Sequence, residues 1–224
     1  MSNSVAQSVE EQLVQVPAGS VTLEGNLTLP EESRGIVLFA HGSGSSRHSS
    51  RNRYVAKLLN EGALATLLID LLTLDEDAVD RLTRRLRFDI PLLAERLVGA
   101  TDWLTQYPST QNLPIGYFGA STGAGAALVA AAERPEVVDA VVSRGGRPDL
   151  AGPVLSLVRA ATVLIVGEND PEVIELNCTA LAQLRCEKQL VIVPGATHLF
   201  EESGALENVA RLARQWFERH LIGV

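Results

Sequence analysis

A serine in a glycine-rich turn is the first feature of this sequence that could do chemistry. Ser121 stands between Gly119 and Gly123 in a G-x-S-x-G pattern, with an apolar run before it and an alanine-rich run after it. On a sharp strand-to-helix turn, such a serine is held outward above the sheet, and the crowded turn requires tiny residues two positions to either side. The glycines at 119, 123 and 125 do not match a dinucleotide-binding G-x-G-x-x-G. The pattern therefore predicts Ser121 as a nucleophile.

A serine nucleophile needs a general base, and four histidines compete for that role. His198, in "VIVPGATHLF", follows the last apolar run and precedes the last helical segment, which places it at the carboxyl edge of the predicted sheet. His41 precedes the serine in the chain, His48 lies in a polar loop, and His220 is expected at the surface of the last helix. The order of residues favours His198 as the base.

An acidic residue must orient the base, and the segment "VLIVGENDPEV" supplies it. The apolar run ends at Gly167, and Asp170 lies in the loop that follows, with Glu168 as a nearby alternative. Asp139 and Asp149 are further candidates beside the neighbouring run. The chain order Ser121, Asp170, His198 is that of the α/β-hydrolase triad.

The polar stretch "LFAHGSGSSRHSSRNR" raises several alternatives: a nucleophile, a phosphate cradle, a metal site or a solvated loop. A phosphate-binding loop ending in Gly-Lys-Ser/Thr is absent. Arg144 and Arg147, with Arg47 or Arg51 from this stretch, could bind a carboxylate or phosphate of a substrate. The alternative is that all four are solvated arginines balancing an acidic surface.

Short apolar runs alternate with helix-period segments along most of the chain. Strands are predicted over residues 35–40, 63–70, 113–120, 138–143, 161–167 and 188–195. Helices are predicted over residues 52–62, 90–107, 121–133, 172–184 and 205–221. Residues 20–30 are interpreted as a hairpin or two edge strands about Glu24-Gly25-Asn26, and residues 71–87 as a loop with a helical turn.

Repeated strand–helix units predict an α/β fold, a mostly parallel twisted sheet with helices on both faces and an N-terminal antiparallel hairpin. We expect one domain over residues 1–224, with residues 1–10 as a flexible N-terminus. About twenty residues separate the strand at 138–143 from the next one, so no large cap domain is expected and the site should be open.

The composition excludes several classes of protein. A net charge of −8 argues against a nucleic-acid binder, and no apolar run approaches the ~18 residues of a membrane span. Cys178 and Cys186 suit a reduced compartment and have no partners at metal-ligand spacing, so no metal is expected. Residues 1–12 do not resemble a signal peptide. We expect a cytoplasmic protein, monomeric or homodimeric.

The motifs together resemble the α/β-hydrolase superfamily, and within it the dienelactone hydrolase-like family. The resemblance rests on "AHGSGSS", "GYFGASTGAG", "LIVGENDP" and "VPGATHLFEE", which are spread over most of the chain. Dienelactone hydrolases use a cysteine nucleophile where this chain has Ser121. The resemblance implies a serine hydrolase that cleaves an ester, lactone or related acyl bond of a small substrate, which could be anionic, without a cofactor.

The resemblance also implies a role for the opening loop. The backbone N–H groups of Ser43 and Thr122 would form the oxyanion hole, with Gly42 and Gly44 allowing the loop to turn and Gly42 contacting the substrate. His41 would anchor the loop rather than act as the base. The alternatives are a thioesterase or small peptidase with the same triad, and a non-catalytic binding protein on the same scaffold.

Overall fold

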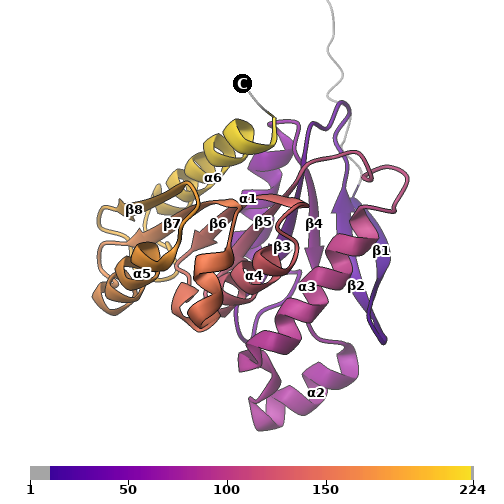
Figure 1. Ribbon diagram of the computed structural model, residues 1–224, viewed down its shortest axis with the longest axis horizontal. Coiled ribbons are helices and arrows are strands. Elements are labelled where there is room, and N and C mark those ends of the chain that lie inside the picture. The colour runs from indigo at the N-terminus through magenta and orange to yellow at the C-terminus, as the bar shows by residue number, and fades with distance from the viewer. Residues whose placement is uncertain (1–10, 223–224) are drawn as a thin grey trace, which may run out of the picture.

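An eight-stranded sheet forms the centre of the molecule in the computed structural model, which describes residues 11–222 (Figure 1). The order across the sheet is β1-β2-β4-β3-β5-β6-β7-β8. β1 and β2 pair antiparallel, as do β2 and β4, and all other neighbours pair parallel. The strands are β1 (Glu11–Ala18), β2 (Val21–Thr28), β3 (Ile36–Ala40), β4 (Ala65–Ile69), β5 (Ile115–Ala120), β6 (Val138–Arg144), β7 (Ala161–Gly167) and β8 (Lys188–Val193).

Helices cover both faces of this sheet, which confirms the predicted fold class. The helices are α1 (Ser50–Asn60), α2 (Leu74–Thr83), α3 (Ile90–Leu104), α4 (Thr122–Glu133), α5 (Pro171–Gln183) and α6 (Ala205–Leu221), with 3₁₀ segments η1 (Leu86–Phe88) and η2 (Pro148–Leu157). α3, α4 and α5 pack on one face, and α1 and α6 on the other. Within residues 11–222 the structure shows no large cap domain, since only the short η2 lies between β6 and β7. Residues 1–10, expected to be flexible, lie outside the described part of the chain.

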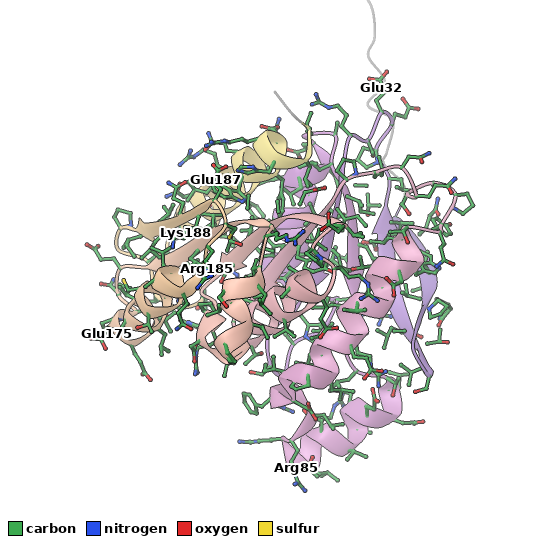
Figure 2. All side chains as sticks on the ribbon, in the orientation of Figure 1. Glu32, Arg85, Glu175, Arg185, Glu187 and Lys188 are labelled. Atoms are coloured by element: carbon green, nitrogen blue, oxygen red, sulfur yellow. The ribbon has the colours of Figure 1, made fainter. Side chains whose placement is uncertain are left out.

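Many charged side chains lie at the periphery of this layered core. Glu32, Arg85 and Glu175 are exposed and stand at the outline of the molecule in Figure 2, and Arg185, Glu187 and Lys188 are exposed as well. The central strands β3 and β5 are buried along their whole length, because helices cover them from both sides.

The N-terminal antiparallel hairpin is present as β1 and β2, but the predicted position of its turn, at Glu24-Gly25-Asn26, was wrong. Residues 21–28 form one strand, β2, and its antiparallel partner is the unpredicted β1. The polar residues that suggested a turn are paired within the strand. Arg47 donates from Nη2 to Glu24 Oε2 at 2.6 Å and from Nε to Asn26 Oδ1 at 2.9 Å. A long-range charge network, which the local sequence cannot reveal, therefore replaces the turn.

The segment 71–87 was also predicted wrongly, because it contains a helix, α2, rather than a loop. A capping box starts this helix: Glu76 N–H donates to Thr73 Oγ1 at 3.2 Å, and Thr73 N–H donates to Glu76 Oε2 at 2.8 Å. The spacing Thr73-x-x-Glu76 was present in the sequence and could have predicted the helix.

Parallel strands bring distant loops to one edge of the sheet. β3, β5, β6 and β7 end at Ala40, Ala120, Arg144 and Gly167, and register pairs Ala40 with Gly119 and Ala120 with Arg144. The loops that follow these strands are therefore neighbours, at the carboxyl edge where open α/β sheets bind their ligands.

Candidate active site

Ser121 is the single residue between β5 and α4. Its backbone has φ +51° and ψ −122°, a conformation that costs a residue with a side chain about 1–3 kcal/mol. Two backbone hydrogen bonds tie this residue to the end of β6 and the loop after it: Ser121 N–H donates to Arg144 O at 3.2 Å, and Arg147 N–H donates to Ser121 O at 3.0 Å. The loop after β6 therefore stabilises the strained turn.

The two flanking glycines are required by close packing. A Cβ on Gly119 would lie 2.5 Å from the Cα of Ala124, and a Cβ on Gly123 would lie 2.4 Å from the carbonyl oxygen of Ala40. Both contacts involve backbone atoms, which cannot move aside as a flexible side chain can. The crowding expected for the G-x-S-x-G turn is present at both positions.

His198 and Asp170 are in direct contact although they lie 28 residues apart. The Nδ1 atom of His198 is 2.6 Å from Oδ2 of Asp170. Asp170 follows β7 and precedes Pro171, the first residue of α5. The competing Glu168 is exposed, and its Oε2 accepts the Gly195 N–H at 2.8 Å. The acid beside the histidine is thus Asp170 and not Glu168.

Gly145 makes room for the loop that carries His198. A Cβ at this position would approach the carbonyl oxygen of His198 to 2.9 Å and its Cε1 atom to 3.6 Å, and the φ of +51° also favours glycine. The histidine loop therefore lies directly on the turn that follows β6.

A cavity of about 250 Å³ joins these groups. Ser121 and His198 line it together with Gly42 and Ser43 from the loop after β3, and Arg144 from the end of β6. The structure thus brings the predicted nucleophile and base to one cavity, with the predicted acid on the far side of the imidazole.

The loop after β3 makes a tight turn beside Ser121. Ser45 N–H donates to Gly42 O at 3.1 Å, and Gly44 has a φ of +69°. Ser43, as the second residue of this turn, does not use its own N–H to close it. A Cβ on Gly42 would lie 3.2 Å from the Cβ of Ser121, so this loop approaches the serine closely. Thr122 is the first residue of α4, where an N–H has no acceptor within the helix.

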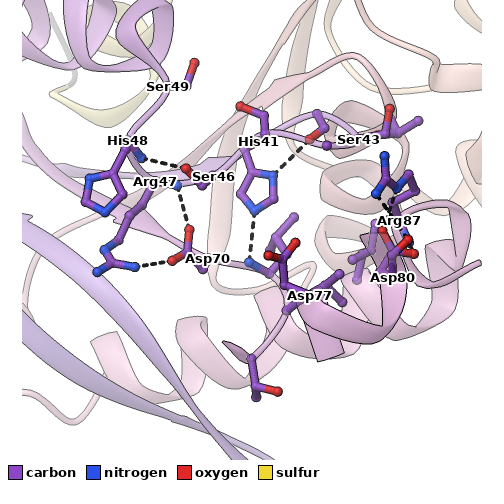
Figure 3. A pocket seen from close by; sticks show the side chains of 18 of the residues that line it. His41, Ser43, Ser46, Arg47, His48, Ser49, Asp70, Asp77, Asp80 and Arg87 are labelled. Carbon is purple, nitrogen blue, oxygen red and sulfur yellow. Dashed lines mark hydrogen bonds and ion pairs between the residues drawn. The ribbon is translucent and has the colours of Figure 1, made fainter. Parts of the chain in front are cut away.

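His41 holds this loop in place through both ring nitrogens (Figure 3). Leu71 N–H donates to Nε2 at 3.1 Å, so Nε2 carries no proton, and Nδ1 donates its proton to Gly42 O at 3.0 Å. Burial lowers the pKa of His41, while the Gly42 carbonyl and the charges of Asp70 and Asp77 oppose that shift. His41 is therefore a neutral anchor of the Gly42–Ser45 turn, as expected.

The candidate arginines differ in their surroundings. Arg47 is paired with Asp70 and Glu24, and Arg147 donates two hydrogen bonds to Asp149, at 2.8 and 2.7 Å. The charges of both side chains are already neutralised. Arg144 is buried in the small cavity and forms no ion pair with residues 11–222.

A second cavity, of about 650 Å³, lies on the other side of the Gly42–Ser45 turn. Ser43 and Thr122 border it, and α2 and η1 form its far wall. Asp80 is buried there and accepts a hydrogen bond from Arg87 Nε at 2.5 Å (Figure 3). It also accepts one from Leu86 N–H at 2.8 Å. This wall was missed by the sequence interpretation because the helix itself was missed.

His220 is less exposed than its expected place at the helix surface. Its ring lies 4.4 Å from that of Trp216, and its side chain is mostly covered, so the prediction of a surface residue was wrong. The last helix packs this face against the sheet. His220 belongs to α6 and does not line either cavity.

Within residues 11–222, no three His, Cys, Asp or Glu side chains are grouped so as to hold a metal ion. None of the helices in that range combines the length and the apolar character of a membrane span.

Comparison with known proteins gives relatives of two kinds. No protein-family model matches the chain. Two curated proteins from Mycobacterium tuberculosis, strains CDC 1551 and H37Rv, are 60% identical over 215 residues and carry the provisional name phosphoribosyl transferase. The match covers 96% of this chain and 48% of each relative, so the chain spans about half the length of the curated relatives it matches.

Solved structures give the second kind of relative. A dienelactone hydrolase from Anabaena variabilis is 64% identical, with a TM-score of 0.94 over 95% of this chain and 99% of that one. Two more distant structures share the fold. One is an esterase domain from Rhodothermus marinus, at 21% identity and a TM-score of 0.75, with 95% of this chain and 100% of that one covered. The other is a dienelactone hydrolase-like promiscuous phosphotriesterase from metagenomic libraries, at 16% identity and a TM-score of 0.76, with 95% of this chain and 98% of that one covered. Given 64% identity to a dienelactone hydrolase over nearly its whole length, on the sheet and turn described above, the chain belongs to the dienelactone hydrolase family of α/β-hydrolases.

Proposed function

We propose that this protein is a serine hydrolase that cleaves an ester or related acyl bond of a small substrate through an acyl-enzyme. The observation that carries the proposal is the 2.6 Å contact between His198 Nδ1 and Asp170, with Ser121 and His198 on one cavity. With its Nδ1 proton donated to Asp170, the imidazole has its lone pair on Nε2, the nitrogen available as a base.

The reaction would proceed in two steps on these residues. Ser121 Oγ attacks the acyl carbon while His198 Nε2 accepts the hydroxyl proton, and the protonated imidazole then returns that proton to the leaving group. Asp170 orients the ring and stabilises its positive charge. Water repeats the sequence on the acyl-enzyme and releases the acid. Because Ser121 is already held in its strained conformation, little reorganisation is required for the attack.

The developing oxyanion would be stabilised by the N–H groups of Ser43 and Thr122. Thr122 N–H lies at the start of α4, where the helix dipole favours negative charge, and Ser43 N–H is outside the hydrogen bond of its turn. Loss of one such donor lowers the rate by roughly 100- to 1,000-fold in comparable sites. His41 contributes indirectly, because it holds the Gly42 carbonyl and so the orientation of the loop.

The transferase name of the curated relatives does not describe this geometry. Those proteins are about twice as long as the matched region, and the groups assembled around Ser121 support acyl transfer to water rather than transfer of a phosphoribosyl group. The proposal concerns the region present in this chain.

The proposal is tested with a panel of p-nitrophenyl esters, thioesters and aminoacyl substrates. Ser121→Ala is expected to abolish turnover of any substrate that the wild type hydrolyses, and Asp170→Asn to lower kcat by roughly 10³- to 10⁴-fold, because an amide does not stabilise the imidazolium charge and can hold the imidazole in the wrong tautomer. Ser109→Ala, an exposed serine at the opposite edge of the sheet, and Glu168→Gln, an acid beside Asp170, are the matched controls. Full activity of Ser121→Ala would refute the proposal.

A further inference from the structure

Helix α2 presents an apolar face to the outside of the molecule. Leu74, Val79 and Leu82 are 74%, 54% and 88% exposed, and Ala78 is exposed as well. Because residues four apart lie in one row along a helix, Leu74, Ala78 and Leu82 form a stripe, and Val79 lies beside it. A surface helix ordinarily turns such a stripe toward the core, so the orientation of α2 is inverted.

Charged groups, rather than apolar packing, attach α2 to the protein. Asp80 is the only buried residue of Leu74–Thr83, and it is paired with Arg87 of η1. Glu76 Oε1 accepts a hydrogen bond from Arg96 Nη2 of α3 at 2.8 Å. The inner face of the helix is therefore acidic, and its apolar face is left for another surface. In Figure 1 the helix lies at the lower edge of the molecule, away from the sheet.

The charges of this segment are divided between its two ends. Acidic residues occupy the first turn of the helix, and arginines occupy its last turn and the positions just after it: Asp75, Glu76, Asp77, Arg81, Arg84 and Arg85. Two antiparallel copies of the helix would place the acidic end of each beside the basic end of the other, with opposed dipoles. A parallel pair would bring like charges together. The segment is thus complementary to a second copy of itself.

We propose that α2 is the contact of a homodimer, in which two copies of the helix pack antiparallel about a two-fold axis. Ala78 lies midway between Leu74 and Leu82, so an axis beside Ala78 packs Leu74 of each copy on Leu82 of the other. The small side chain of Ala78 allows the two helices to approach closely. Because a helix of 10 residues is only about 15 Å long, the contact is short, and we expect a dimer that dissociates reversibly.

The apolar face of α2 also borders the larger cavity. Leu74, Asp77 and Arg81 line that cavity, and Arg81 is paired with Asp77 at 2.7 Å. Their spacings of three and four residues place them along one edge of the helix, next to the stripe. The second copy would therefore stand at the rim of the cavity, on the side opposite the Gly42–Ser45 turn. The dimer contact and the wall beside that turn share one helix.

Sedimentation velocity from about 1 µM to about 1 mM protein tests the dimer without any substrate. The wild type is expected to pass from monomer to dimer over this range. Leu82→Ser should raise the dissociation constant at least about 10-fold, since each copy loses a leucine that the contact buries. Leu157→Ser, at a 61% exposed leucine of η2, is the matched control and should dimerise like the wild type. Circular dichroism verifies folding. A wild type that stays monomeric, or equal dissociation constants in the two variants, would overturn the proposal.

Charge reversal tests the antiparallel orientation. Asp75→Lys and Arg84→Glu should each weaken association about 3- to 10-fold, and an equimolar mixture of the two variants should restore it, because opposite charges then face each other at both ends. A mixture no better than either variant alone would refute the antiparallel pair. Phosphatidylcholine vesicles test the other occupant of an apolar face: co-sedimentation of a monomeric wild type that is lost in Leu82→Ser would refute the dimer and assign the face to a lipid surface.

Discussion

Two histidines in this molecule have opposite tasks because their hydrogen bonds differ. His41 uses both ring nitrogens within the fold, one as donor to Gly42 and one as acceptor from Leu71. His198 uses Nδ1 on Asp170, and its Nε2 has no hydrogen-bond partner among residues 11–222. A proton that moves on and off an imidazole needs such an open nitrogen. The base of the proposed mechanism is therefore identified by its open ring nitrogen. The residue type alone does not reveal which histidine has one.

The anchoring role of His41 predicts a pH-dependent stability. Because burial lowers its folded-state pKa below 6.5, the unfolded chain binds more protons in the range between that lowered pKa and 6.5. Stability is therefore fully present above about pH 6.5 and falls as the pH drops below it. Protonation would also remove the acceptor of the Leu71 N–H.

Urea unfolding at about pH 7.5 and pH 5.5 measures this effect. The loss of unfolding free energy between the two pH values should be smaller in His41→Gln than in the wild type. His48→Gln, an exposed histidine in the same loop, is the control and should show the wild-type loss. An equal loss in His41→Gln and the wild type would mean that another group causes the pH dependence.

At the scale of elements, α2 and η1 matter because they form the wall beside the Gly42–Ser45 turn. Burial raises the pKa of Asp80, but hydrogen bonds from the Arg87 side chain and from the N–H groups of Arg87 and Leu86 outweigh it, so the pKa is lowered overall. Asp80 thus ties η1 to α2. Arg87 in turn lies against the loop, since a Cβ on Gly44 would be 3.1 Å from its Nη1.

Breaking this tie should destabilise the wall. Asp80→Ala leaves the Arg87 guanidinium and two N–H groups without their acceptor, and we expect it to lower the free energy of unfolding by about 3 kcal/mol. Asp75→Ala, an exposed acid in the first turn of the same helix, should lower it by no more than about 1 kcal/mol. Thermal and urea unfolding measure both variants; equal, small losses would show that Asp80 does not hold η1.

The strands and helices also show which parts of the fold could be predicted from the sequence. Buried parallel strands such as 35–40 and 161–167 were predictable because their apolar runs depend only on burial from both faces. β1 and the unbroken course of β2 were not, because the polarity of Glu24 and Asn26 is balanced by Arg47, more than twenty residues away. α2 was predictable from its capping box, and its amphipathic pattern was hidden by exposed apolar residues such as Leu74 and Leu82.

At the scale of the whole molecule, the parallel sheet brings loops that are distant in the chain together at one site. Ser121, Asp170 and His198 were identified as candidates from motifs and strand ends, since parallel strands place successive loops on one edge. The states of the arginines could not be predicted in this way, because whether Arg47 or Arg144 meets a carboxylate depends on side-chain packing between distant segments. The fold thus predicts where chemistry occurs, and packing decides which charges remain available for a substrate.

The most direct test of the central claim, that Ser121 is an activated nucleophile, is labelling with a fluorophosphonate followed by peptide mass spectrometry. The proposed site predicts one adduct per chain, on Ser121, with labelling much slower in His198→Ala because the base is lost. Ser109→Ala should label like the wild type. An unmodified Ser121 in folded protein, or an adduct confined to another serine, would contradict the proposed mechanism.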